Sequence, residues 1–78
     1  MSEKEKEWAD KMRRFLKAEM KRADITYAEL AKRLNDHGLE GETVASINSK
    51  LVRGTFPATF LLACLAVLGI SALVLADL

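Results

Sequence analysis

The sequence is short of the residues that build disulfide frameworks, metal clusters and rigid turns. Its 78 residues contain one cysteine, one proline and four glycines. A single cysteine forms no intrachain disulfide and no cysteine-based metal cluster, so a hydrophobic core has to hold the fold together. A chain of this length supplies one such core and not two. We therefore expect a single domain over residues 1–78, with a frayed N-terminus at residues 1–5.

Residue sets that carry out catalysis are missing as well. The chain contains no glycine-rich phosphate loop, no carboxylate pair and no Ser/His/Asp set. His37 has no second ligand at a metal spacing, and Cys64 lies in an apolar run without a neighbouring base. We expect neither enzymatic activity nor a cofactor. The N-terminal segment lacks the apolar stretch of a secretory signal, so the expected location is cytoplasmic.

Charge is absent from residues 55–76. A helix of about 20 apolar residues is long enough to span a bilayer, so a membrane anchor through this run is one reading. Pro57, Gly69 and Ser71 divide the run, however, where a soluble helix would begin and end. The run would also supply the apolar surface against which apolar residues elsewhere in the chain can pack. We therefore favour a buried helix and expect no membrane as a partner.

Half of the residues are hydrophobic and 29% are charged, a balance typical of a folded globular domain. The first predicted helix runs from about Glu5 to Arg22. Apolar residues recur in it at steps of three and four, which predicts an inward face made of Trp8, Met12, Phe15, Leu16 and Met20. Basic residues fall on the opposite face, at Arg13, Lys17 and Lys21.

A second helix is predicted to begin near Tyr27. Thr26 and Glu29 have the spacing of a capping box, in which each side chain satisfies a free backbone N–H of the other residue. The inward face would consist of Tyr27, Leu30, Ala31 and Leu34. The outward face would carry Glu29, Lys32 and Arg33. An expanded turn follows over residues 35–42, where two glycines and several turn-forming residues lie.

Two further helices follow the turn. The third is predicted from about Thr43 to Arg53, with Val44, Ile47 and Leu51 inward, and Gly54 ends it. The fourth begins near Pro57 and ends at Gly69, and its interior is apolar on all sides. The segment after it, residues 70–78, fits a short helix or an edge strand equally well. These elements predict an all-α fold: a compact four- to five-helix bundle with a helix-turn-helix-like core made of helices two and three.

The order of these elements resembles the Cro/C1-type (lambda-repressor-like) helix-turn-helix family. Residues 25–31 (Ile-Thr-Tyr-Ala-Glu-Leu-Ala) look like the opening of that family's helix two, Arg53-Gly54 like the exit from its recognition helix, and residues 65–70 like the end of its helix four. The likeness extends over residues 12–75. The chain resembles still more closely an uncharacterised group of small bacterial domains of unknown function, through residues 16–22, 26–34 and 49–56.

The repressor resemblance implies that helix three faces the major groove of double-stranded DNA. It implies DNA contacts by an outward set made of Lys32, Arg33, Thr43, Ser46, Ser49, Lys50 and Arg53. Phosphate contact by Lys50 and Arg53 is the firmest part of this expectation. Glu19 lies on the apolar side of helix one, and repressor domains link helix one to the end of helix three by an ion pair. We therefore expect Glu19 to pair with Arg53 or Lys50, or else to reach water at the rim.

The leading hypothesis from the sequence is a DNA-binding domain of repressor-like fold that acts as a small transcriptional regulator. A homodimer through helix four and the C-terminal tail is expected, because a helix that is apolar on every side needs more cover than a short chain provides. The alternative is a helical protein–protein interaction module without DNA binding.

Overall fold

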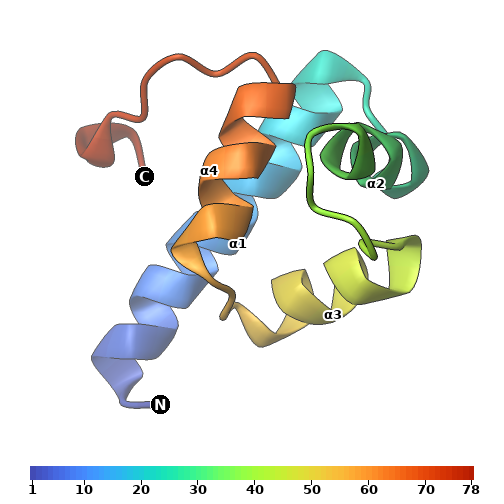
Figure 1. Ribbon diagram of the computed structural model, residues 1–78. Coiled ribbons are helices and arrows are strands. Elements are labelled where there is room, and N and C mark those ends of the chain that lie inside the picture. Colours follow the sequence, from blue (N-terminus) through green and yellow to red (C-terminus); the bar gives the residue numbers. More distant parts are fainter.

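Four α-helices and a short 3-10 turn make up the chain. The computed structural model describes all residues 1–78 and contains α1 (Glu3–Ala23), α2 (Tyr27–Asp36), α3 (Val44–Arg53), α4 (Ala58–Val67) and the 3-10 turn η1 (Leu75–Asp77). In Figure 1, α1 runs behind α4, while α2 and α3 lie on one side of this pair and the C-terminal segment leaves on the other. The predicted all-α class is confirmed.

The first helix begins earlier than the apolar pattern indicates. It starts at Glu3, two residues before the predicted start, because the hydroxyl of Ser2 accepts a hydrogen bond from the N–H of Glu5 at 3.1 Å. Glu3 and Glu5 place negative charge beside the free N–H groups of the first turn, which favours the helix further. Helical structure thus extends into residues 1–5, where a frayed end was expected.

The predicted capping box of α2 forms only in part. The hydroxyl of Thr26 accepts from the N–H of Glu29 at 3.2 Å, but the Glu29 carboxylate turns to the Nε of Arg33 at 3.1 Å. The reciprocal arrangement occurs instead at α3, where the hydroxyls of Thr43 and Ser46 each accept from the other residue's N–H. Serine replaces the usual Glu or Gln in this box.

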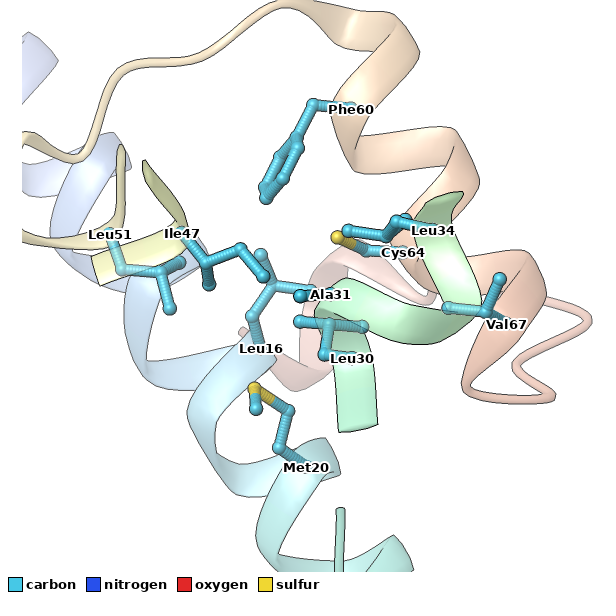
Figure 2. Close-up of a cluster of buried hydrophobic side chains, with 10 residues drawn as sticks. All are labelled: Leu16, Met20, Leu30, Ala31, Leu34, Ile47, Leu51, Phe60, Cys64 and Val67. Atoms are coloured by element: carbon cyan, nitrogen blue, oxygen red, sulfur yellow. The ribbon is translucent and has the colours of Figure 1, made fainter. Parts of the chain in front are cut away.

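All four helices contribute to one core (Figure 2). Its buried side chains are Leu16, Met20, Leu30, Ala31, Leu34, Ile47, Leu51, Phe60, Cys64 and Val67. Every one of them was predicted to lie inward or within the apolar run of α4. No charged or polar side chain is buried with them, so the core is held by apolar packing alone.

Two residues predicted to lie in the core are exposed. Trp8 is 59% exposed and Val44 is 48% exposed. Trp8 belongs to the N-terminal half of α1, which extends past the core residues Leu16 and Met20. Val44 is the first residue of α3, and Ile47 and Leu51 already fill the contact between α3 and the core. Helical periodicity predicts on which face of a helix a residue lies. It does not show how far the neighbouring helices extend along that face.

The connection between α2 and α3, residues 37–43, is long but firmly held. The side-chain amide of Asn35 donates to the carbonyl oxygens of Ala31 at 2.7 Å and Glu42 at 2.9 Å, and its oxygen accepts from the N–H of Gly41 at 3.0 Å. Leu39 packs against the core, and its N–H donates to the Leu34 carbonyl at 2.9 Å. The expanded turn predicted from the sequence is therefore an ordered connection that the side chain of Asn35 holds in place.

The uncharged run of residues 55–76 does not form one continuous helix. It contains α4, a segment without regular secondary structure and part of η1. No single helix of the chain is long and apolar enough to cross a membrane; α3 and α4 reach that length only together, and they are bent by 118°. The sequence leaves the C-terminal segment open between helix and strand. It has no regular secondary structure over residues 70–74 and ends in the 3-10 turn η1.

Gly54 brings the end of α3 close to α1. It caps α3 in the left-handed conformation, with φ of +71°, as the sequence predicts. A Cβ atom at this position would lie 2.8 Å from the Cβ of Ala9, so an L-residue would also collide with α1. Gly38 shares the positive φ, but a Cβ there would meet nothing within 4 Å.

This pair of glycines gives a matched test. Replacing Gly38 with Ala should lower the free energy of unfolding by about 1 kcal/mol, the cost of the left-handed backbone alone. Gly54→Ala should cost at least about 2 kcal/mol, because overpacking against Ala9 adds to the same backbone penalty. Urea unfolding measures both. In an Ala9→Gly background, the cost of Gly54→Ala should fall to that of Gly38→Ala; an unchanged cost would show that the contact with α1 is not the cause.

Candidate nucleic-acid interface

The exposed part of α3 carries small and polar side chains together with two valines, Val44 and Val52. Its members at helical spacing are Ala45, Asn48, Ser49, Val52 and Arg53. No residue of α3 is acidic, and its two bases, Lys50 and Arg53, lie in the last turn. The predicted face consisted of Ser46, Ser49, Lys50 and Arg53. The observed face has Ala45, Asn48 and Val52 in place of Ser46 and Lys50. Of the four predicted residues, Ser49 and Arg53 are exposed as expected.

Lys50 points inward, which corrects the prediction that it stands on the outer face. Its ammonium lies 2.9 and 3.0 Å from the two carboxylate oxygens of Glu42, and 5.1 Å from the centre of the Phe60 ring. The side chains of Lys50 and Glu42 are only 20% and 13% exposed. A charge removed this far from water needs a partner, and Glu42 supplies it. Lys50 is therefore engaged in the fold rather than free to contact a phosphate.

Ser46 belongs to the same cluster. Its hydroxyl donates to Glu42 at 2.7 Å while accepting from the N–H of Thr43 at 2.8 Å. The side chain is thus occupied in capping α3 and in solvating the Glu42 carboxylate. Thr43 caps the helix through its Oγ1 and remains exposed at the start of α3. Sequence reasoning missed Glu42 because it lies in the connection before α3, where no helical spacing relates it to Lys50.

The two predicted contact residues on α2 have different surroundings. Lys32 is exposed. Arg33 is half-buried: its Nε binds the Glu29 carboxylate, and its terminal nitrogen donates to the carbonyl oxygen of Val67 at 3.0 Å. That carbonyl lies at the last turn of α4, where the helix dipole favours a cation. Arg33 therefore ties α2 to α4, in contrast to its predicted outward position.

The link between α1 and the end of α3 is made by a different residue from the predicted one. Glu19 pairs with Arg22 on its own helix at 2.6 Å, so the expected pair with Arg53 or Lys50 is wrong. Instead, the guanidinium of Arg13 donates to the carbonyl of Val52 at 3.1 Å and also binds the carboxylate of Asp10. The sequence pattern does not indicate this contact, because its acceptor is a backbone carbonyl, which every residue has.

Cys64 is enclosed by the core beside the Glu42–Lys50 pair. Its side chain is 1% exposed. Burial, and to a smaller degree the negative charge of Glu42, raises the pKa of the thiol to about 12, while Lys50 acts in the opposite direction. The thiol is therefore protonated at neutral pH, which suits packing and not nucleophilic chemistry. No group of three or more His, Cys, Asp or Glu side chains could hold a metal ion.

The family described as a domain of unknown function (DUF6471) matches residues 8–73. The chain belongs to the DUF6471 family. The match begins in α1 at Trp8, spans α2, α3 and α4, and ends in the C-terminal segment. No curated protein and no solved structure matches the chain.

Two substitutions in this DUF6471 domain test whether Lys50 supports the fold and whether Arg53 does not. Lys50→Ala should lower the free energy of unfolding by about 2 kcal/mol, because Glu42 then keeps a shielded charge without a cation. Arg53→Ala should change it by no more than about 0.5 kcal/mol, as expected for an exposed site. Chemical denaturation measures both. The double variant Glu42→Gln with Lys50→Met should be more stable than Lys50→Ala; a neutral Lys50→Ala would show that the pair does not support the fold.

The buried thiol gives the domain a characteristic loss of stability at high pH. The folded-state pKa of Cys64 lies above its ordinary value of 9.0, so the neutral thiol stabilises the fold below pH 9.0 and this contribution is lost as pH rises toward about 12. The free energy of unfolding should fall by up to about 1.4 kcal/mol per pH unit in this range. Cys64→Ala should lack this component, and groups that titrate in both proteins cancel in the difference. Parallel pH profiles of the two proteins would contradict the assignment.

Proposed function

We propose that this DUF6471 domain binds double-stranded DNA through a helix-turn-helix-like unit made of α2 and α3. The observation that carries the proposal is the exposed face of α3, on which Ala45, Asn48 and Ser49 are small or polar, on a helix with no acidic residue. Small side chains allow a helix to lie close to base edges in the major groove. The absence of carboxylates removes the repulsion that phosphates would meet there.

Basic residues flank this face. Lys32 on α2 and Arg53 at the end of α3 are exposed, and neither takes part in an ion pair of the chain. Their charges are therefore available for phosphates, in contrast to those of Arg33 and Lys50. Thr43 at the N-terminal end of α3 adds a hydroxyl at a place where helices commonly approach phosphate groups. The domain has a net charge of only +1, so these local positions have to supply the attraction.

Asn48 and Ser49 are the residues suited to read bases. They lie near the middle of the exposed face of α3. An asparagine amide donates and accepts at the same time, which matches the major-groove edge of adenine, while a serine hydroxyl pairs with several bases. In this proposal Asn48 joins Ser49 of the predicted contact set, whereas Ser46 and Lys50 of that set are engaged in the fold.

The order of helices supports a regulatory role. It resembles that of Cro/C1-type repressors, in which the second helix of the unit enters the major groove. A small transcriptional regulator is the corresponding function. The connection between α2 and α3 is longer than the three or four residues of the common turn, but Asn35 and Leu39 hold it in place. The longer connection therefore need not loosen α3.

A protein-interaction module is the second candidate, and exposed apolar residues favour it. Trp8 is 59% exposed and Leu75 is 69% exposed. They line the same groove of about 530 Å³ as Met12, Phe56 and Leu61. Apolar surface gathered around a groove is typical of a site that contacts another protein. This surface involves α1 and the C-terminal segment, so it can coexist with DNA binding through α3.

DNA binding is tested by fluorescence anisotropy with a labelled random-sequence duplex between about 50 and 200 mM salt. Affinity should fall steeply with salt. Arg53→Ala and Lys32→Ala should each reduce the slope of log affinity against log salt by about 0.9, the value for one lost phosphate contact. Selection from a random library should show that Asn48→Ala relaxes the preference at one base pair, where a good contact is worth about 1 to 3 kcal/mol.

Lys17 on α1 is the control, because it is exposed and lies outside the α2–α3 unit. Lys17→Ala should leave the salt slope nearly unchanged. If Lys17→Ala abolishes binding while Arg53→Ala and Lys32→Ala do not, α3 is not the recognition helix. The absence of binding to any duplex at about 50 mM salt would leave the protein-interaction module as the function to pursue.

A further inference from the structure

Most of the unpaired positive charge of the domain lies on α1. Six of the 12 lysine and arginine side chains take part in ion pairs. Four of the remaining side chains belong to α1: Lys11, Arg14, Lys17 and Lys21. Steps of three and four residues place these four on one side of the helix, opposite the buried Leu16 and Met20. We call this side of α1 the basic face.

Acidic side chains do not neutralise the basic face. Between Lys11 and Arg22 the only acid is Glu19. Its side chain is 16% exposed, and its carboxylate already lies 2.6 Å from the guanidinium of Arg22. Arg14 uses only its Nε, which donates to the carbonyl oxygen of Asp10 at 3.3 Å. Its two terminal nitrogens are therefore free to bind a carboxylate through two parallel hydrogen bonds.

A partly apolar cleft of about 720 Å³ borders the basic face. Lys11 and Arg14 line it together with residues of the C-terminal segment. Its larger apolar lining residues are Phe15, Ile70 and Val74. Phe15 packs against the core, whereas Val74 is 54% exposed. In Figure 1 the C-terminal segment lies on the side of α1 and α4 away from α2 and α3, so this cleft and the exposed face of α3 are separate surfaces.

We propose that the basic face and this cleft bind an acidic segment of another protein that carries an aliphatic side chain. Carboxylates of the segment pair with the four bases, and its aliphatic side chain fills the cleft. The bases extend over about 15 Å of α1, at a rise of about 1.5 Å per residue. An extended segment of about five residues covers this length. Each exposed ion pair contributes little, so burial of the aliphatic side chain supplies much of the affinity.

The cleft distinguishes a protein segment from other anionic partners. A DNA duplex would match the charges, but its surface of phosphates would leave the apolar cleft unfilled. A membrane-surface helix inserts its apolar face between lipids, whereas α1 turns its apolar face into the core. A second copy of this chain would offer the acids near its N-terminus, but Glu3 and Glu7 are already paired with Lys6 and Lys4. A separate acidic segment therefore fits this surface best.

Fluorescence anisotropy of the full chain with a labelled Glu-Glu-Leu-Glu-Glu peptide tests the proposal at about 20 mM salt, where exposed charges are weakly screened. This peptide should bind at least about tenfold more tightly than Glu-Glu-Gly-Glu-Glu, because only the leucine fills the cleft. The double variant Lys11→Gln with Arg14→Gln should weaken binding of the leucine peptide at least about fivefold.

The matched control is Lys32→Gln with Arg53→Gln, which removes two unpaired charges outside α1. It should change the affinity for the leucine peptide by less than about twofold, since a distant exposed charge acts weakly. Asp77 lines the cleft without an ion pair and opposes an acidic ligand, so Asp77→Asn should strengthen binding. All five residues lie outside the buried core, so circular dichroism should show equal helix content in all variants.

The proposal does not rest on DNA binding by α3, and the two fail separately. No binding of the leucine peptide at about 1 mM, equal affinity for the two peptides, or equal losses in the two double variants would overturn it. A random-sequence duplex or a phosphatidylserine vesicle that needs Lys11 and Arg14 but not Lys32 and Arg53 would also overturn it, because the basic face would then serve a nucleic acid or a membrane. Self-association in sedimentation that Lys11→Gln with Arg14→Gln abolishes would assign the face to a second copy and overturn it likewise.

Discussion

The position of α3 depends on the shielded ion pair between Glu42 and Lys50. Glu42 belongs to the connection that follows α2, Lys50 to the last turn of α3, and the ammonium of Lys50 lies over Phe60 of α4. One interaction thus joins three parts of the fold at the place where α3 meets the core. The pair also explains why the exposed face of α3 is nearly free of charge. The base that periodicity assigns to that face is instead turned toward Glu42.

Backbone carbonyls complete this arrangement. Arg13 from α1 binds the carbonyl of Val52 in the last turn of α3, and Arg33 from α2 binds that of Val67 at the end of α4. Both acceptors lie where helices have carbonyls without intrahelical partners. Long side chains from neighbouring helices therefore serve as C-terminal caps and as ties between helices. Two bases that would otherwise favour an anionic partner are used in this way, so few basic side chains remain free for the proposed contact with DNA.

The sequence predicted the helices well because apolar spacing and end signals agree. Leu30, Ala31 and Leu34 form the inward face of α2 as expected, and Gly54 ends α3 with a positive φ. Partners of charged side chains were predicted poorly. Spacing can suggest the partner of Glu19 within α1, but it contains nothing about Glu42, which approaches Lys50 only after the chain has turned through residues 37–43. The predicted set of outward residues on α3 therefore included Lys50, which is shielded, and omitted Asn48, which is exposed.

The conformation of the connection between α2 and α3 depends on the side chain of Asn35. In a short turn, the backbone conformation of a few residues fixes the angle between the two helices. Here the amide group of Asn35, near the end of α2, holds the far end of a longer connection through Gly41 and Glu42. Gly38 and Gly41 adopt positive φ on open surface, where a Cβ atom would meet nothing within 4 Å. None of the residues 37, 38 and 40–43 belongs to the buried core, so changes in most of this connection would alter the direction of α3 without altering the core.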